Sequence, residues 1–336
     1  MKNDKILLEH GGGGLMSHEL ITRLFMPRFR NSHLERMEDS AVLDIGSRKL
    51  CFTTDSYVVS PSFFPGGNIG SLAVCGTVND LAVCGGNPLY LSCAVIMEEG
   101  FPMKSLEVIL DTMSEKAIEA GVKIVTGDTK VVARGAADGI FINTSGIGLI
   151  EYPSTLSPKS IQPGDVVLIN GTLGDHGAAI LQARENFLSG SEILSDTAPL
   201  NSLIQAVLKV SPEIRCMRDA TRGGLGVVLA EIAKSARIQI DIDEKSIPVN
   251  ENVRGLCEML GLDPIFLANE GKMVVFCPAR DAPSVYQAMK NHKYGQDAAV
   301  IGRVLSAPQG RVVLKTSIGG ERVIDMPVGE LVPRIC

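Results

Sequence analysis

The sequence contains no tryptophan, and only 4% of its 336 residues are aromatic. It also lacks a long hydrophobic run, because no apolar stretch approaches the roughly 18–20 residues of a membrane-spanning helix. The first residues, MKNDKILLEHGGGG, lack the apolar core of a signal peptide, and no lysine or arginine cluster offsets the formal net charge of −6. We therefore expect a cytoplasmic protein that binds neither membranes nor nucleic acid.

Paired cysteine motifs are absent as well. The eight cysteines are scattered without a CxxC pair, which argues against a disulfide framework and a cysteine zinc site. Most lie in apolar segments such as SLAVCGTV and VVFCPA, where we expect buried, reduced thiols. Cys336 differs, because nothing in the final segment VGELVPRIC predicts burial.

Glycine, by contrast, is abundant, and strand-like and helix-like segments alternate along the chain. KLCFTTDSYVV and LYLSCAVIM predict strands, whereas IGSLAVCGTVNDLAVCGG and MKSLEVILDTMSEKAIEAG predict helices that are closed by glycine. The alternation predicts an α/β fold, and the linker SPKSIQPGD divides it in two. We expect a glycine-rich arm, an N-terminal domain, a C-terminal α/β domain and a short β-rich end with a tail, over residues 1–40, 41–155, 156–308 and 309–336.

Five aspartates lie near predicted strand ends or turns inside apolar sequence: Asp44, Asp55, Asp80, Asp128 and Asp219. A carboxylate in such a place must be hydrogen-bonded or matched by a cation. Oxygen ligands without histidine or thiolate suit Mg²⁺, which bridges to nucleotide phosphates. Each aspartate alone could simply cap a turn. As a set, with Lys130 close to Asp128, they favour a metal and nucleotide site.

Three glycine-rich segments, HGGGG, PGGNIG and TRGGLG, match neither the P-loop nor the dinucleotide fingerprint. PGGNIG and TRGGLG each precede a predicted helix, whose free N–H groups favour an anion. Gly66, Gly67 and Asn68 are therefore candidate nucleotide contacts, although glycine in such a place is more often a tight turn. Arg222 could pair with a phosphate. Asn143, in the predicted strand GIFINTSGIGLI, is a further candidate contact.

Two more side chains could take part in chemistry. Glu270, in FLANEGKMVVF, interrupts an apolar stretch, where a carboxylate could have a raised pKa and act as a general base. A solvated turn before the strand is an equally good interpretation. His176, at a predicted helix start, is more simply a capping-region histidine than a catalytic or phosphate contact.

Several of these segments together resemble one family. DSYVVSPSFFPGGNIGSLAVCGTVNDLA, TGDTKVV, RDATRGGLG, ANEGK and above all the terminal PRIC are similar to the HypE family of hydrogenase maturation proteins. The likeness runs along essentially the whole chain. That family belongs to the ATP-binding superfamily of aminoimidazole ribonucleotide (AIR) synthetase and selenophosphate synthetase. The resemblance implies a two-domain, PurM-like architecture and a homodimer.

The resemblance also implies a reaction. In this family the carbamoyltransferase HypF transfers a carbamoyl group to the C-terminal cysteine, here Cys336. ATP then drives dehydration of the S-carboxamide to an S-thiocyanate, and the cyano group passes to iron on the HypC–HypD complex. The HGGGG arm resembles a mobile segment that folds over ATP, and Lys130 and Glu270 match a pair that accepts protons. The carboxylates that match the Mg²⁺–ATP site are Asp55, Asp80, Asp128 and Asp219, with Asp44 as a nucleotide contact.

Two other functions stay open at this point. A small-molecule ATP-dependent ligase or kinase of the same superfamily would turn over a diffusible substrate without needing Cys336. A carrier or scaffold module would bind partners through its tail without hydrolysing nucleotide. The aspartates together with Lys130 and Glu270 count against the scaffold, and the terminal cysteine counts against the small-molecule enzyme.

Overall fold

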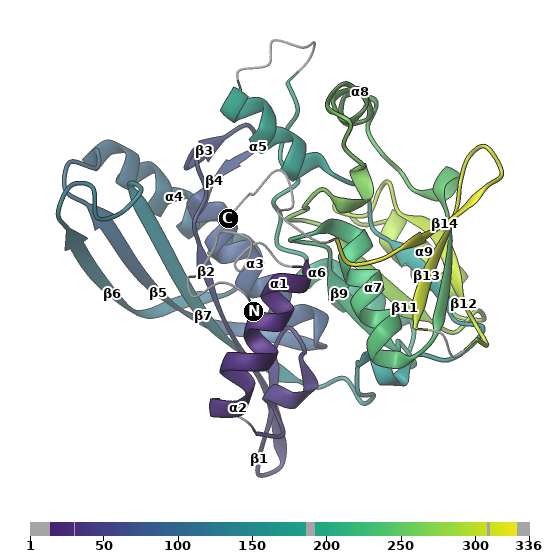
Figure 1. Cartoon of the computed structure of the whole chain (residues 1–336). Helices are drawn as coiled ribbons and strands as arrows, with labels where there is room; N and C mark the ends of the chain where they lie inside the picture. Colours follow the sequence, from purple (N-terminus) through teal and green to yellow (C-terminus); the bar gives the residue numbers. More distant parts are fainter. Residues whose placement is uncertain (1–13, 30, 186–191, 308–309, 328–336) are drawn as a thin grey trace.

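The computed structural model describes residues 14–29, 31–185, 192–307 and 310–327, which form two halves, each built on one sheet (Figure 1). The first, mixed sheet has the strand order β1 (Ala41–Ile45), β2 (Arg48–Tyr57), β7 (Ile140–Ile150), β5 (Gly86–Glu98) and β6 (Lys123–Val132). The second has the order β14 (Glu321–Ile324), β13 (Arg311–Lys315), β10 (Gln239–Asp243), β12 (Ala299–Leu305), β8 (Val166–Ile169), β11 (Met273–Cys277) and β9 (Cys216–Asp219). A two-stranded ladder joins β3 (Phe63–Phe64) to β4 (Gly67–Asn68).

One helix, α3 (Ile69–Val83), belongs to the cores of both halves. It is apolar on every side, and all but one of its residues are buried, as expected for a helix that is covered all round. One side packs on β2, β5 and β7 together with α4 (Met103–Ala120), and the other contacts β9 and α6 (Asn201–Val210). The position of α3 therefore fixes the first sheet relative to the second half.

The first sheet is covered on one face only. Side chains alternate between the two faces of a strand, and Cys51, Tyr57 and Ile142 point toward α3 and are buried. Phe52, Ile147 and Tyr90 lie opposite one another on β2, β7 and β5, on the other face, and are 43%, 37% and 44% exposed. This open face carries apolar side chains although no described element covers it.

The second sheet is covered on both faces. Along β11, Val274 and Phe276 point toward α7 (Gly224–Ala236), whereas Val275 and Cys277 point toward α6 and α9 (Ala282–Lys290). All five β11 residues are buried, which explains why this strand is an uninterrupted apolar run. The remaining helices of this half are α5 (Asp175–Glu185) and α8 (Glu251–Leu260).

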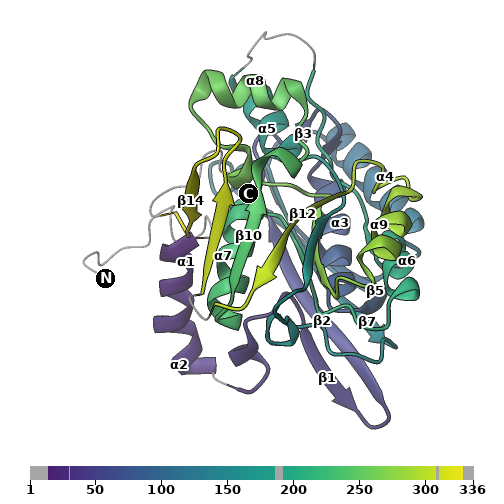
Figure 2. The same cartoon turned by 90° about the vertical axis from the view of Figure 1, so that its right-hand side faces the viewer.

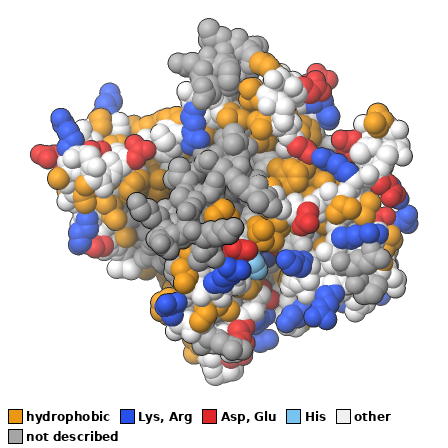
Figure 3. All heavy atoms as spheres, in the orientation of Figure 1, with side chains coloured by type: hydrophobic (Ala, Val, Ile, Leu, Met, Phe, Trp, Pro, Cys, Tyr) orange, Lys and Arg blue, Asp and Glu red, His pale blue; other side chains and the backbone are white. Residues whose placement is uncertain are grey.

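The N-terminal segment forms α1 (Gly14–Leu20), a π-helical stretch (Ile21–Phe25) and α2 (Met26–Phe29), confirming the helix expected there. Figure 2 shows α1 beside α7, where His18 and Lys234 line one cavity. None of the helices among the described residues is long and apolar enough to cross a membrane. On the face drawn in Figure 3, basic and acidic side chains are interspersed.

The predicted α/β architecture is confirmed, including the segments expected to form α3, α4, β5 and β7. The strands β1 and β9 and helix α8 were not predicted. The β-rich end expected over 309–336 is not separate, because β13 and β14 extend the second sheet beside β10. The seven described cysteines are free and at least half-buried; Cys336 and the HGGGG arm lie outside the described residues.

Candidate functional site

The predicted site residues lie on two sides of the first sheet. Asp55 faces α3, since its cross-strand partner Thr144 is buried and its hydroxyl donates to the carbonyl oxygen of Ala73, 2.7 Å away. Asp128 and Asn143 both pair with Ala94 of β5 and occupy the open face. A single chain therefore does not bring the predicted residues together at one point.

On the open face, Asn143 and the β6 residues make local contacts. Asn143 Nδ2 donates to Ser56 Oγ at 3.0 Å. Lys130 Nζ lies 2.9 Å from Asp128, and both side chains are largely exposed. The Lys130 ammonium and the backbone N–H of Thr129 lower the pKa of Asp128. These groups are charged and accessible, but they face away from Glu270.

The second group lies where the two halves meet. Asp80 comes from the C-terminal part of α3, Asp219 ends β9, and Glu270 lies in the turn before β11. Thr53 Oγ1 lies 3.0 Å from both Asp80 Oδ2 and the carbonyl oxygen of Asp39. The structure thus places carboxylates from distant parts of the chain along one boundary.

Asp39 is a member of this group that the sequence analysis missed. Its carboxylate lies 2.5 Å from Arg218 Nε of β9, and the guanidinium also reaches Glu231 at 3.7 Å. The segment MEDSAVLDI carries the signal, since Asp39 lies just before a short strand, in the same segment as the predicted Asp44.

Asp44 itself lies away from this boundary. It pairs with Lys49 near the β1–β2 hairpin, and Asp55 lies six positions after Lys49 along β2. At about 3.3 Å per residue, that separation is roughly 20 Å. The predicted nucleotide contact through Asp44 is therefore not supported within one chain.

Burial and neighbouring carboxylates disfavour the ionised form of Asp39, Asp80, Asp219 and Glu270. Burial raises the pKa of Asp39 to about 7 against the opposing effect of Arg218. Burial and the neighbouring Asp219 and Asp39 raise the pKa of Asp80 well above its ordinary value, and burial raises that of Asp219. Burial, Asp196 and Asp219 likewise raise the pKa of Glu270. A cation at this boundary would relieve both the repulsion and the desolvation.

The start of α7 adds features that suit an anion. Gly223 and Gly224 have positive φ angles, and a Cβ on Gly224 would lie 2.5 Å from the carbonyl oxygen of Leu267, so the turn requires glycine. The Gly224 N–H donates to the carbonyl oxygen of Thr221 at 2.9 Å, but no side chain among the described residues caps this helix, so the N–H groups that follow in its first turn suit an anion. Arg222, just before it, lies 3.8 Å from Asp55 of the first half.

The PGGNIG turn, in contrast, uses its own groups. Asn68 Oδ1 accepts from the N–H of Gly70 and Ser71, and Ser71 Oγ accepts from the Asn68 N–H, so α3 is already capped. A Cβ on Gly66 would lie 2.7 Å from the backbone nitrogen of Ser195. We expected Gly66, Gly67 and Asn68 to offer N–H groups to phosphate. The described contacts show that Asn68 caps α3 and that Gly66 packs on the segment around Ser195, and the nucleotide role of Gly66, Gly67 and Asn68 stays a prediction.

His176 lies in the packed interior between α5 and the first half. It is fully buried, Nδ1 lies 2.8 Å from Ser195 Oγ, and its ring meets the Phe64 ring edge-on at 5.3 Å. Burial lowers the pKa of His176 to about 4, so the ring is neutral near pH 7. The histidine packs α5 against the first half.

Two family models match the chain: "AIR synthase related protein, N-terminal domain" over residues 37–150 and the corresponding "C-terminal domain" over 162–315. Carbamoyl dehydratase HypE of Rhodobacter capsulatus is 48% identical over 339 residues, covering 100% of this chain and 99% of the relative. The chain belongs to the HypE family. A crystal structure of a HypE–HypF complex is 47% identical with a TM-score of 0.87, covering 92% of this chain and 99% of that one. A HypE structure in complex with ATP is 45% identical with a TM-score of 0.82, covering 99% and 100%.

The raised pKa values in this HypE-family chain predict a pH-dependent difference between the wild type and Asp39→Asn. The Asp39 pKa rises from 3.8 to about 7 on folding, so the folded state binds this proton more tightly than the unfolded state. Wild-type stability then falls, relative to the variant, as pH rises from about 4 to about 7. The lowered pKa of His176 changes stability with pH in the opposite direction. This contribution is the same in the wild type and the variant, so it cancels in the difference between them.

Melting temperatures measured with EDTA and without nucleotide test this prediction. The Tm of Asp39→Asn minus that of the wild type should increase over this pH range. Asp111→Asn, a change at an exposed site on α4, serves as the control and should give a constant difference. A constant difference for Asp39→Asn would show that burial does not penalise its charge.

Proposed function

We propose that this protein dehydrates a carbamoyl group carried on Cys336, converting an S-carboxamide to an S-thiocyanate at the expense of ATP. Membership of the family whose relatives are named carbamoyl dehydratase supports the reaction type. The observation within the chain that supports it most is the row of buried carboxylates beside the uncapped start of α7. Such a row suits a cation and the phosphates that the cation binds.

Mg²⁺ fits the oxygen donors at this boundary. No three carboxylates of the described residues surround one point at metal-ligand distances. That is compatible with Mg²⁺, which typically uses one or two protein carboxylates and completes its shell with water and phosphate oxygens. We assign Asp55, Asp80 and Asp219 to this role, with Asp39 as the added member. The metal would neutralise charge on the phosphates and on these carboxylates.

The remaining groups fit a nitrile-forming dehydration. Transfer of the γ-phosphate to the amide oxygen makes that oxygen a leaving group, and loss of two N–H protons with departure of phosphate leaves the S–C≡N group. Burial holds the pKa of Glu270 well above its ordinary value, which brings this carboxylate nearer to the range of an effective base at neutral pH. Arg222 and the start of α7 lie close enough to the boundary to bind phosphate.

Lys130, the expected partner of Glu270, lies on the opposite face of the first sheet. We propose that a homodimer brings the two together, with Lys130 and Asp128 of one copy completing the site of the other. The exposed row of Phe52, Ile147 and Tyr90 gives the open face an apolar surface for a second copy. The unpaired edge of β6 continues this surface.

The reaction needs a donor and an acceptor for Cys336. We propose HypF as the carbamoyl donor, supported by the similar structure of a HypE–HypF complex, and the HypC–HypD complex as the acceptor of the cyano group. We place these exchanges in the cytoplasm.

Mass spectrometry of the C-terminal peptide tests the reaction. After incubation with HypF, carbamoyl phosphate and Mg–ATP, Cys336 should carry a carbamoyl group that then loses one water. With a non-hydrolysable ATP analogue the carbamoyl adduct should persist. Cys93→Ser, at a half-buried position, should behave as the wild type, whereas Cys336→Ser should stay unmodified. ATP consumption that depends on another compound, with Cys336 unmodified, would favour the small-molecule enzyme.

The proposed proton pathway is tested by Glu270→Gln and Lys130→Ala. Each variant should slow dehydration by about 10²–10⁴-fold, as expected for loss of a general base or its partner, with ATP affinity nearly unchanged. If the pair forms across two copies, mixing the variants should restore activity. Random mixing makes half of the dimers mixed, each with one intact site of two, so about a quarter of wild-type activity should return. Mixtures as inactive as either variant would place both residues in one subunit.

The open face as the dimer surface is tested by Ile147→Asp. A charge at the centre of an apolar contact cannot be buried without a partner, so this variant should be monomeric. Molar mass by light scattering should fall to that of one chain. Ile318→Asp, at a position 95% exposed between β13 and β14, is the matched control and should leave the mass unchanged. A dimeric Ile147→Asp protein would locate the contact elsewhere.

A further inference from the structure

Glu270 is held through its backbone rather than through its side chain. Among the described residues its carboxylate has no hydrogen-bond partner, and its side chain projects from the short turn before β11. The direction of the carboxylate therefore depends on what fixes residues 270–272. In the described structure a single side chain, Asp196, makes contacts with all three.

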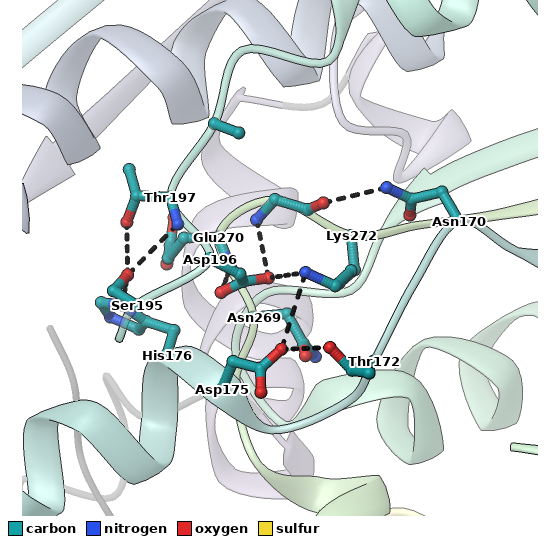
Figure 4. A network of polar contacts seen from close by, with 12 residues as sticks. Asn170, Thr172, Asp175, His176, Ser195, Asp196, Thr197, Asn269, Glu270 and Lys272 are labelled. Atoms are coloured by element: carbon teal, nitrogen blue, oxygen red, sulfur yellow. Dashed lines mark hydrogen bonds and ion pairs between the residues drawn. The ribbon is translucent and has the colours of Figure 1, made fainter. Parts of the chain in front are cut away.

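Asp196 binds this turn at three points (Figure 4). Its Oδ1 accepts from the Glu270 N–H at 3.1 Å, and its Oδ2 accepts from the Gly271 N–H at 3.1 Å and from Lys272 Nζ at 2.9 Å. The Asp196 side chain is only 4% exposed. Charge-assisted bonds of this kind are short and strong when water is excluded.

Lys272 is the counter-ion that keeps Asp196 charged. It lies between Asp196 and Asp175, 3.8 Å from the latter, and Asn250 Nδ2 donates to Asp175 at 2.6 Å. Although burial opposes it, the Lys272 ammonium lowers the pKa of Asp196. The network is anchored at both ends, and Asp196 cannot turn away without leaving Lys272 partly unpaired.

The segment that carries Asp196 is also tied to the first half of the molecule. The Ser195 N–H donates to the carbonyl oxygen of Pro65 at 2.8 Å. Asn79 of α3 donates to the carbonyl oxygen of Ala198 at 3.0 Å and accepts from the Leu200 N–H at 2.7 Å. Since Asp55 and Asp80 belong to the same half as Pro65 and Asn79, this segment relates their position to that of Glu270.

We infer that Asp196, with Lys272 as its counter-ion, is a positioning residue that sets the carboxylate of Glu270 against the nucleotide carboxylates of the first half. This role deepens the proposed function and rests on it. Asp196 touches neither substrate nor nucleotide in this scheme; it acts through Glu270. A misplaced base slows the chemical step while leaving nucleotide binding almost unaltered.

A double-mutant cycle separates this role from a general structural one. Asp196→Asn keeps the shape but weakens the bond to Lys272, and we expect kcat for dehydration to fall about 10²-fold with the KM for ATP within about twofold of wild type. Glu270→Gln alone should be at least as slow. The double variant should be no slower than Glu270→Gln, because the two residues act through one carboxylate.

Two further variants guard against a folding defect. Lys272→Met should reproduce the loss in kcat, and Lys272→Arg should recover most of it. Asp297→Asn, exposed on the rim of the cavity of about 280 Å³ that Asp196 also lines, is the matched control and should match the wild type. Melting temperatures confirm that each variant is folded.

Multiplicative losses in the double variant, or a raised KM with unchanged kcat, would overturn the positioning role. A slow Glu270→Gln beside a wild-type Asp196→Asn would reject this inference and leave the proposed function standing. A wild-type kcat in Glu270→Gln would show that Glu270 is not the general base, and the positioning role of Asp196 would then be rejected as well.

Discussion

Several carboxylates are buried close together at the boundary between the two halves, and the rest of the structure depends on this constraint. Asp39, Asp80, Asp219 and Glu270 are removed from water; Asp219 raises the pKa of the other three, and Asp39 raises that of Asp80. Such an arrangement lowers the stability of the folded chain. A cation bound at the boundary, together with the phosphates it carries, would offset this loss of stability.

Two sets of contacts connect the two halves at this boundary. Helix α3 is buried by both halves, and its Asn79 side chain bonds the backbone of residues 198 and 200. The Ser195 N–H bonds Pro65, and Gly66 leaves room for that contact. Because Asp196 lies within the same segment and holds the turn of Glu270, these contacts and the backbone that carries the Glu270 carboxylate are parts of one network.

The first sheet separates the chemical groups onto two faces. Its covered face carries Asp55, and its open face carries Asn143, Asp128 and Lys130. One copy of the chain therefore presents the predicted site residues on two faces and an exposed apolar surface at the same time. Association of two copies through that surface would address both conditions, which ties the oligomeric state to the chemistry.

The amino-acid sequence predicted the order of most helices and strands, because the apolar periodicity of segments such as IGSLAVCGTVNDLAV and VVFC reflects burial directly. It also determined the family, through motifs spread over the whole chain. Which acids lie close together is visible only in the folded chain: Asp39 joins the boundary carboxylates, Asp44 lies away from them, and Asn68 of PGGNIG caps α3. Contacts such as Asp196 with Glu270 join residues 74 positions apart. Local pattern carries no information on such pairs, since they depend on how the whole chain packs.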